Sequence, residues 1–228
     1  MNSPSVTVLM TVFNARPYLS ASVRSILDQS FRDLEFLIID DGSTDGSTDE
    51  LRAWAQRDPR VRVIANTRNS GQTPCLNQGI AEARGVWIAR QDADDISHPE
   101  RLMKQMQALR ERPALALLGC NGWLADASGR FQGLINAPCG ESSVRWTAIF
   151  SNPFLHTAVC FRTADARQLG GYDPAFRIAQ DYDLWLRIGA AAPGDNLPER
   201  LVTYRVHAQS LSNAARDATR REGEASCR

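Results

Sequence analysis

Three carboxylates, Asp92, Asp94 and Asp95, fall within four residues, shortly after the apolar run Val86-Trp87-Ile88. The apolar run predicts a buried strand, and the acids follow where that strand is expected to end. Side chains on a strand-to-helix turn lie at the mouth of an open α/β sheet, where such sheets bind ligands. Carboxylates this close repel one another unless a hard divalent cation, bridging to a substrate's phosphates, removes the repulsion. The alternative is a solvated acidic turn, a common structure for Asp-rich segments.

The segment after these acids predicts the start of a helix. Ser97 is placed to cap this helix, Glu100 to complete a capping box, and Pro99 falls in the first turn, where no hydrogen-bonded N–H is needed. A second pair of acids, Asp40 and Asp41, ends the apolar run 34–39. If the two strands are neighbours in a parallel sheet, both sets of acids face one crevice.

The composition is that of an ordinary globular protein. The chain has 228 residues, enough for one large α/β domain or two small ones. With 26 basic and 26 acidic residues the net charge is zero, so nothing indicates a nucleic-acid partner. No apolar run approaches the roughly 20 residues of a membrane span, and no signal-peptide pattern is present. The five cysteines form no CxxC pair, which favours neither a zinc site nor a disulfide framework and predicts a reduced, cytoplasmic protein.

The first half of the chain alternates strands with helices. This alternation predicts right-handed βαβ units and a mainly parallel sheet with helices on both faces. We predict strands at 6–12, 34–39, 61–64 and 86–89, and helices that end at about residues 29, 56 and 85.

The pattern becomes irregular after residue 112. We predict strands at 114–118, 120–124, 131–135, 157–161 and 201–206, and helices at 141–150, 163–169 and 181–190. The organisation expected is one domain, 1–212, whose nucleotide-type half (about 5–112) and mixed half (about 113–212) share a sheet. Residues 213–228 are polar and lack core positions, which predicts a disordered tail.

Two common nucleotide and metal motifs are excluded. The segment from Asp41 resembles a calcium loop superficially, but its twelfth position is Arg52 instead of Glu, and a strand precedes it. Neither GxxxxGK[ST] nor GxGxxG follows the first strand. If a nucleotide binds, acidic side chains and a metal must therefore hold it without a glycine-rich phosphate cradle.

Taken together, the chain resembles the large inverting family of nucleotide-sugar glycosyltransferases called family 2. The resemblance is collinear from about Val6 to Ser212. It implies an α/β fold of the GT-A type, with a Rossmann-like, mostly parallel central sheet flanked by helices and a mixed, acceptor-side second half. It rests on seven motifs in order: VTVLMTVFNARPYLSASVRSILDQSF, LEFLIIDDGSTDGS, NSGQTPCLNQGIAEARGVWIARQDADD, NPFLHTAVCFR, GGYD, QDYDLWLRI and YRVHAQSLS.

The resemblance implies a nucleotide site at the strand ends. Thr11 and Phe13 would line the pocket of the base, and Asp41 would accept a hydrogen bond from it. Thr11 and Phe13 could instead be plain strand-end packing, and Phe13 replaces a tyrosine common in the family. Further residues placed near the nucleotide are Asn14, Asn69 and Gly71.

Asp92-Ala93-Asp94 would be the family's DxD motif. In that motif Asp92 would contact the ribose, and Asp94 would ligate the Mg²⁺ or Mn²⁺ that bridges the two phosphates. Asp92 and His207 are the other candidate metal ligands, although a histidine at such a position is more often structural.

Asp181 matches the family's general base, and the segment Gly170-Gly171-Tyr172 would shape the acceptor side. The alternative for Asp181 is an acid in the first turn of its helix, where the helix dipole favours a negative charge. Gln180 stands where the family often has Glu, a departure that touches acceptor preference more than chemistry.

The resemblance implies a metal-dependent, inverting glycosyltransferase with a nucleotide-sugar donor, a UDP-sugar first and dTDP- or GDP-sugars next. It would transfer one sugar to a hydroxyl of a growing, lipid-linked surface glycan. We expect the protein in the cytoplasm, and peripheral contact with the inner face of the cytoplasmic membrane stays open. The chain lacks the extra acceptor motif of processive synthases, which favours single-sugar transfer.

Two other function classes stay open. A sugar nucleotidyltransferase would need a glycine-rich, basic loop after the first strand, which the segment 11–14 does not supply. A non-catalytic sugar-nucleotide binding protein is disfavoured because Asp92, Asp94 and Asp181 are all retained.

Overall fold

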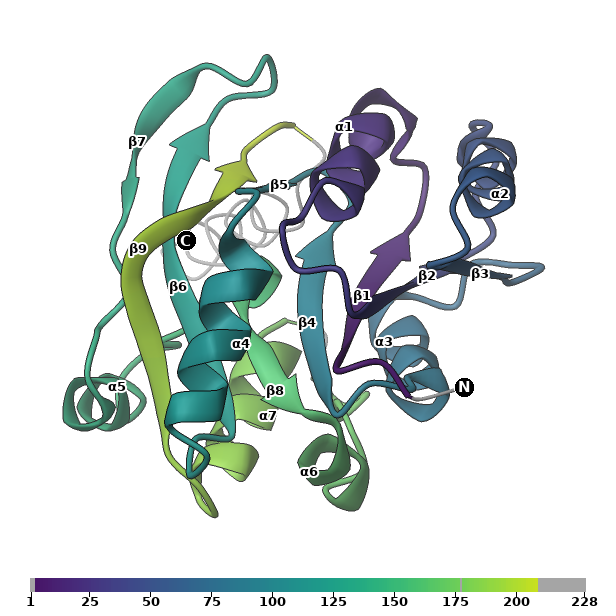
Figure 1. The fold of residues 1–228 in the computed structure, drawn as a ribbon. Coiled ribbons are helices and arrows are strands. Elements are labelled where there is room, and N and C mark those ends of the chain that lie inside the picture. Colours follow the sequence, from purple (N-terminus) through teal and green to yellow (C-terminus); the bar gives the residue numbers. More distant parts are fainter. Residues whose placement is uncertain (1–2, 177, 209–228) are drawn as a thin grey trace, which may run out of the picture.

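The computed structural model describes residues 3–176 and 178–208. Within these residues one sheet of nine strands runs through both halves of the chain (Figure 1), in the order β3-β2-β1-β4-β8-β6-β9-β5, with β7 paired to β6. The sheet is therefore shared by the two halves.

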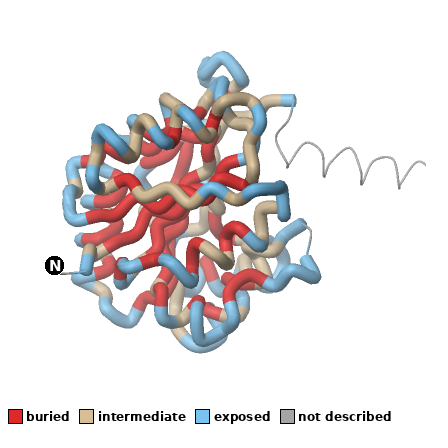
Figure 2. The backbone as a smooth tube through the Cα atoms, turned by 90° about the vertical axis from the view of Figure 1, so that its right-hand side faces the viewer, coloured by how far each residue is buried: buried red, intermediate tan, exposed pale blue. Residues whose placement is uncertain are grey.

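The first half is a parallel sheet with helical crossovers, as the alternating pattern predicts. β1 and β2 are almost fully buried because helices cover both faces, whereas β3, at the edge of the sheet, is mostly half-buried; Figure 2 shows the burial in the centre of the molecule. The strands, all mutually parallel, are β1 (Val6–Val12), β2 (Leu34–Asp40), β3 (Val61–Ala65) and β4 (Trp87–Asp92). The crossover helices are α1 (Arg16–Leu27), α2 (Ser47–Arg57) and α3 (Gln72–Glu82).

The second half adds a mixed sheet, which confirms the predicted change of pattern. β8 (Cys160–Arg162) is antiparallel to β4 and to β6 (Leu117–Ala125), whereas β9 (Gly194–Arg205) is parallel to β6. Two short antiparallel strands, β5 (Ile96–Ser97) and β7 (Phe131–Ile135), pair with β9 and β6. The helices are α4 (Arg101–Glu111), α5 (Glu141–Thr147), η1 (His156–Ala158, a 3₁₀ turn), α6 (Thr163–Gln168) and α7 (Gln180–Gly189).

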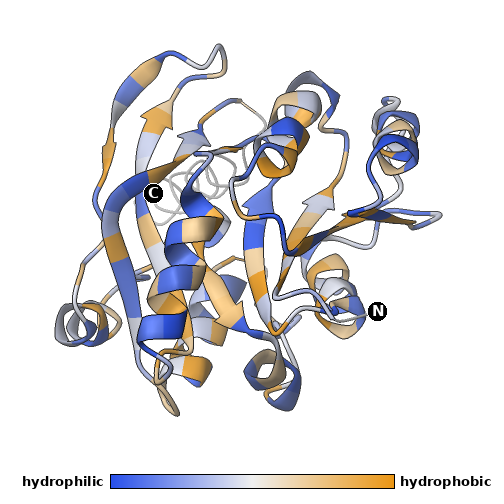
Figure 3. Cartoon of the chain, in the orientation of Figure 1, coloured by the Kyte–Doolittle hydropathy of each residue, from blue (hydrophilic) through white to orange (hydrophobic). Residues whose placement is uncertain are grey.

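Two layers of helices enclose the sheet. One apolar cluster joins a face of the sheet to α1, α2 and α4 through Leu19, Leu51 and Leu102. The other joins the opposite face to α3, α5, α6 and α7, for example through Leu76 and Leu184. In Figure 3, which is coloured by hydropathy, apolar residues are concentrated in the central strands, and polar residues lie on the outer sides of the helices.

Several predicted boundaries in the second half are wrong. The two strands predicted at 114–118 and 120–124 are one strand, β6, which begins only at Leu117, because pairing with β9 continues across Gly119. β9 begins at Gly194 and not at residue 201, since it follows β6 along its whole length. The strand predicted at 157–161 begins only at Cys160, after η1.

The predicted capping box before α4 is also wrong. Ser97 lies in β5, buried, and its hydroxyl donates a hydrogen bond to Gln91 Oε1 (2.6 Å). The helix begins later, at Arg101, with Glu100 at the N-cap and no side-chain cap. Tertiary pairing of β5 with β9 takes Ser97 away from the role that its local sequence predicts.

Within the described part of the chain, no helix combines the length and apolar character needed to cross a membrane. The tail predicted at 213–228 and the last residues of the predicted domain lie outside the described residues.

Gly42, in the loop after β2, has a φ of 74°, and a Cβ there would lie 2.8 Å from the carbonyl carbon of Arg68. Because the strain and the clash both involve backbone, Gly42→Ala should lower the free energy of unfolding by about 1–3 kcal/mol, measured by urea denaturation. Gly133→Ala in β7 is the matched control, since a Cβ there has nothing within 4 Å. Equal midpoints for the two variants would contradict this close approach of the loops.

Candidate functional site

The carboxyl ends of β2, β1 and β4 lie side by side at one edge of the sheet. In the register, Val12 is opposite Asp40 of β2, and Thr11 is opposite Asp92 of β4. The two acidic strands are therefore separated by β1 instead of being direct neighbours. Both sets of acids still flank the end of β1, at the edge where open parallel sheets bind ligands.

Asp41 is buried beneath the loop that carries Asn69 and Gly71. Its Oδ1 accepts hydrogen bonds from the N–H and the hydroxyl of Ser70 (2.8 and 2.9 Å), and its Oδ2 accepts one from the Gly71 N–H (2.8 Å). Asp41 therefore fixes this loop to the end of β2. Its contact with a nucleotide base stays a prediction, and both of its oxygens already have a partner.

The turn after β1 is locked to the loop after β2. Asn14 has a φ of 51°, a conformation that asparagine adopts more readily than most residues. Its N–H donates to Ser43 Oγ (3.0 Å), and its Oδ1 accepts from the Thr44 N–H (2.8 Å). Next to it the Phe13 side chain is 49% exposed, and Thr11 is half-buried. An exposed ring at this edge can stack on a base.

Asp92 is oriented from within the protein by Arg90, whose side chain is fully buried. Arg90 Nη2 donates to Asp92 Oδ1 (2.6 Å), and Arg90 Nε donates to His156 Nε2 (3.2 Å). Its Nη1 donates to the carbonyl oxygens of Leu9 and Gln91. A buried guanidinium requires such partners, so Arg90 fixes Asp92 relative to β1 and η1.

The turn 92–95 is held from two sides. Gln91 Nε2 donates to the carbonyl oxygens of Asp92 (3.2 Å) and Asp95 (2.9 Å). From the end of β9, the Arg205 N–H donates to Asp95 Oδ1 (2.7 Å), and Arg205 Nε donates to the Asp94 carbonyl (2.9 Å). The last described strand thus closes over the acidic turn.

Burial and mutual repulsion raise the pKa of two of these carboxyl groups. The pKa of Asp94 is raised by burial and by the charge of Asp92, against a lowering hydrogen bond from His207. The pKa of Asp95 is raised well above its usual range by burial and then by Asp94 and Asp92. Asp95 Oδ2 is buried without a hydrogen-bond partner among the described residues. The turn therefore concentrates negative charge that a bound cation would relieve.

Asp94 and His207, two of the predicted metal ligands, lie together beyond the end of β4. His207 Nε2 lies 2.8 Å from Asp94 Oδ2, and its ring lies against Tyr18 with centroids 4.6 Å apart. Among residues 3–176 and 178–208, no three His, Cys, Asp or Glu side chains are grouped as a metal site. Two protein ligands suit Mg²⁺ or Mn²⁺ that completes its shell with water and substrate phosphates. For Asp92 the role of ligand stays a prediction, with its Oδ1 bonded to Arg90.

Asp181 lies in the first turn of α7, half-buried, on the other side of the site. Its Oδ2 accepts a hydrogen bond from Asn152 Nδ2 (2.7 Å), while Asn152 Oδ1 accepts from the Phe154 N–H (3.1 Å). The neighbouring Gln180 donates from Nε2 to Gln72 Oε1 (3.2 Å) at the start of α3. Asp181 is thereby positioned beside the loop that Asp41 holds.

His156 and Tyr172 lie within electrostatic reach of both Asp92 and Asp181. His156 Nε2 accepts from Arg90 Nε and lies 3.0 Å from the Tyr172 hydroxyl, so the neutral ring carries its proton on Nδ1. Burial, and then the charge of Arg90, lower the pKa of His156, while the charges of Asp181 and Asp92 act in the opposite sense. Tyr172 is fully buried, and its role in shaping the acceptor side stays a prediction.

Comparison with known proteins decides the family. The model of glycosyl transferase family 2 matches residues 7–159. The chain belongs to this family. The putative glycosyltransferase EpsE of Bacillus subtilis is 34% identical, over 90% of this chain and 74% of its own length. The O-antigen biosynthesis glycosyltransferase WbnJ of Escherichia coli is 32% identical, over 92% of this chain and 83% of its own length.

Solved structures show that this family 2 member has the GT-A fold, as expected from the resemblance. The mannosyltransferase PcManGT from Pyrobaculum calidifontis, in complex with GDP-Man and Mn²⁺, has a TM-score of 0.71 at 19% identity over 92% of this chain. TarS of S. aureus, in complex with UDP, has a TM-score of 0.73 at 19% identity over 88% of this chain. The chain spans 59% and 60% of the lengths of these two structures.

Several residues that build the site were not found by sequence reasoning. For Arg90 and Gln91 a signal was available in the sequence of β4, because charged and amide side chains inside a buried strand must be paired. Asn152, His156 and Thr157, whose Oγ1 accepts from the Asp92 N–H (3.1 Å), lie in the motif NPFLHTAVCFR, within which no residue was assigned a role. The missed residues are Arg90, Gln91, Asn152, His156 and Thr157.

The lowered pKa of His156 predicts a loss of stability on acidification. As pH falls through the ordinary histidine pKa of 6.5, the unfolded chain binds a proton that the folded chain does not bind. The contribution of neutral His156 to the free energy of unfolding is present above that pH and is lost below it, by at most about 1.4 kcal/mol per pH unit. His156→Gln should flatten the decline in unfolding free energy between about pH 7 and 5.5 in urea titrations. His98→Gln, at an exposed site, is the control, and an unaltered slope in His156→Gln would refute the assignment.

Proposed function

We propose that this family 2 member is a metal-dependent, inverting glycosyltransferase that transfers one sugar from a nucleotide sugar to a hydroxyl of a growing, lipid-linked surface glycan. One observation carries the proposal. The side chains of Arg90, His156 and Tyr172 link the end of β4 to the surroundings of Asp181: Arg90 bonds to Asp92, and the charges of both Asp92 and Asp181 act on His156 and Tyr172.

The donor would lie across the carboxyl edge of the sheet. Its base would stack on the exposed Phe13 and lie near Thr11, Asn14 and the loop held by Asp41, and its ribose would contact Asp92. The solved structures of PcManGT and TarS, which share the fold, contain GDP-Man, UDP or UDP-GlcNAc, and this supports a nucleotide-sugar donor. We propose a UDP-sugar first, with GDP- and dTDP-sugars as alternatives for the same pocket.

Asp94 and His207 would hold Mg²⁺ or Mn²⁺ against the donor diphosphate. When bound, the cation stabilises the negative charge that develops on the departing diphosphate. The chain's own part is to keep the ligands in place: Arg205 holds the Asp94 backbone, and Tyr18 supports the His207 ring. The presence of Mn²⁺ in the PcManGT complex supports this choice of metal.

Asp181 would remove the proton from the attacking hydroxyl. A carboxylate within hydrogen-bond reach of that hydroxyl is sufficient for this role. The Asn152 amide holds one of its oxygens and so fixes the direction of the carboxylate. A single displacement of this kind inverts the anomeric carbon and requires no second carboxylate as a nucleophile.

The names of the relatives and the state of the cysteines support the proposed acceptor and compartment. The relatives include WbnJ, named for O-antigen biosynthesis, and TuaG of Bacillus subtilis, named as a putative enzyme of teichuronic acid biosynthesis. Both names support a surface polysaccharide as the product. The described cysteines are free thiols, in keeping with a reducing compartment such as the cytoplasm.

The donor site predicts a metal-dependent thermal shift. One class of nucleoside diphosphate should raise the Tm of the wild type with Mn²⁺ or Mg²⁺ but not with EDTA, since a ligand at a hundredfold excess over Kd stabilises by about 2.7 kcal/mol. Asp94→Asn should lose the metal-dependent part of the shift. Asp49→Asn, whose side chain is 83% exposed on α2, should keep it. Absence of any nucleotide shift in the wild type would exclude the proposed donor site.

The role of Asp181 predicts a loss of turnover without a loss of donor binding. Asp181→Asn should lower release of nucleoside diphosphate from the donor by a factor of about 10²–10⁴, measured with water or glycan as acceptor. Asp183→Asn removes the same charge from the same helical turn, where Asp183 pairs with Arg187, and should change turnover only a few-fold. Equal losses in both variants would contradict the base role, and a wild type that binds donor without turnover would favour a non-catalytic binding protein.

A further inference from the structure

The half-buried imidazole of His156 carries a hydrogen-bond donor that no described residue uses. Its Nε2 accepts a hydrogen bond from Arg90 Nε (3.2 Å), because a guanidinium can only donate. In the neutral ring the proton therefore lies on Nδ1. Nδ1 makes no hydrogen bond with the described residues, yet it is not one of their buried polar atoms that lack a partner. The Nδ1–H group is thus accessible to a ligand.

The protein interior holds the His156 ring in one orientation. The Tyr172 hydroxyl lies 3.0 Å from Nε2, and the two ring centroids are 5.7 Å apart. The Trp185 ring packs against the imidazole with centroids 6.1 Å apart. Arg90, Tyr172 and Trp185 are all buried, so Nε2 points into the protein. Nδ1, on the other side of the ring, is turned toward the surface.

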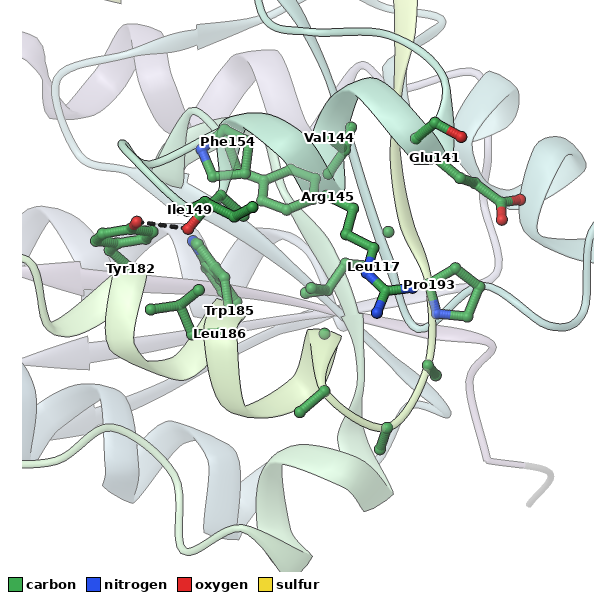
Figure 4. A pocket seen from close by; sticks show the side chains of 18 residues that line it. Leu117, Glu141, Val144, Arg145, Ile149, Phe154, Tyr182, Trp185, Leu186 and Pro193 are labelled. Carbon is green, nitrogen blue, oxygen red and sulfur yellow. Dashed lines mark hydrogen bonds between the residues drawn. The ribbon is translucent and has the colours of Figure 1, made fainter.

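The open side of His156 does not face the cavity between α5 and α7. That cavity, of about 460 Å³, is shown in Figure 4, and Tyr182, Phe154 and Trp185 contribute to its wall. His156 packs against Trp185 but does not itself line the cavity. A ligand therefore reaches Nδ1 from another direction.

His156 belongs to the segment that joins the surroundings of Asp92 to those of Asp181. Thr157, the next residue, accepts a hydrogen bond at Oγ1 from the Asp92 N–H (3.1 Å), which places η1 against the end of β4. Four residues before His156, Asn152 Nδ2 donates to Asp181 Oδ2 (2.7 Å). The charges of Asp181 and Asp92 both act on the His156 ring. The imidazole thus has the two carboxylates within electrostatic reach.

The proposed function places the transferred sugar in the same region. The ribose and the diphosphate of the donor would lie at Asp92 and Asp94, and the attacking hydroxyl at Asp181. The anomeric carbon is joined to the diphosphate and receives that hydroxyl, so the sugar must lie between these two places. Saccharides present hydroxyl and acyl oxygens, which accept hydrogen bonds, and the Nδ1–H of His156 is a matching donor.

The state of His156 suits it to recognition instead of proton transfer. The lone pair of Nε2 is used by Arg90, and Nδ1 already carries a proton. Burial, and then the charge of Arg90, lower the pKa of His156, so the ring stays neutral near pH 7. Removal of the proton is therefore left to Asp181. A site built to donate a hydrogen bond disfavours a sugar that lacks the accepting oxygen, because the donor is then left unpaired.

We propose that His156 binds the sugar that is transferred and contributes to the choice of donor. Its Nδ1–H donates a hydrogen bond to a hydroxyl or acyl oxygen of that sugar. Arg90 then has two effects, since it orients the Asp92 carboxylate and also fixes the tautomer of His156. This inference rests on the proposed function, which places the donor at Asp92 and the acceptor at Asp181.

The test measures, by calorimetry with Mn²⁺, the dissociation constants of UDP and UDP-GlcNAc and of GDP and GDP-mannose from the full chain. The pair that binds the wild type more tightly gives the ratio of the constant of the nucleotide sugar to that of the nucleotide. His156→Gln keeps an acceptor oxygen at the place of Nε2 but loses the donor at Nδ1. It should raise this ratio about three- to tenfold and leave the constant of the nucleotide unchanged.

Two further variants complete the design. His156→Asn carries an amide N–H that can take the place of Nδ1–H, and it should keep the ratio within about twofold of that of the wild type. His98→Gln, at an exposed site, is the matched control and should have the ratio of the wild type.

A purely structural role of His156 predicts the opposite order. His156→Gln would then bind both ligands as the wild type does, and His156→Asn, without an acceptor for Arg90, would weaken both alike. That result would overturn the inference while the donor site stands. Equal weakening of both ligands in His156→Gln would overturn it too, since the contact would not be with the sugar. If no nucleotide and no nucleotide sugar binds the wild type with Mn²⁺, the proposed function itself fails.

Discussion

The buried guanidinium of Arg90 is the constraint on which the rest of the site depends. Its donors reach the Leu9 carbonyl of β1, the Asp92 carboxylate at the end of β4, and His156 in η1. A charge so deeply buried is tolerated only when its hydrogen bonds are made, because an unpaired one costs several kcal/mol. The first half of the sheet and the η1 segment of the second half must therefore fold together, and Asp92 acquires its orientation as a consequence.

The acidic turn itself joins the beginning and the end of the described chain. β5 pairs with β9, and the Arg205 N–H reaches Asp95 across 110 positions of sequence. His207, just beyond β9, then lies against Asp94. Neither half could build this arrangement alone. This gives a physical reason why one continuous sheet runs through the donor half and the acceptor half of our proposal.

The sequence predicts the parts of this structure that depend on local pattern. The strands of the first half are continuous apolar runs, and their positions agree with β1, β2 and β3 to within about one residue. β4 runs three residues past its predicted end at Ala89, because Arg90, Gln91 and Asp92 are polar residues that only tertiary partners make compatible with a buried strand. Ser97 and β9 were misjudged for the same reason, since long-range pairing overrides capping and turn signals. The proximity of His207 to Asp94 followed from a family resemblance, and no local spacing encodes it.

In the proposed function, Asp94 and His207 hold a metal ion against a nucleotide diphosphate at the carboxyl edge of the sheet. The most direct measurement is anomalous diffraction at the manganese edge from crystals grown with Mn²⁺ and the nucleoside diphosphate that gives the largest thermal shift. We expect a manganese peak at the side chains of Asp94 and His207, with the diphosphate next to it and the base at Phe13. A nucleotide bound elsewhere, or bound at this edge with no manganese beside Asp94, would contradict it.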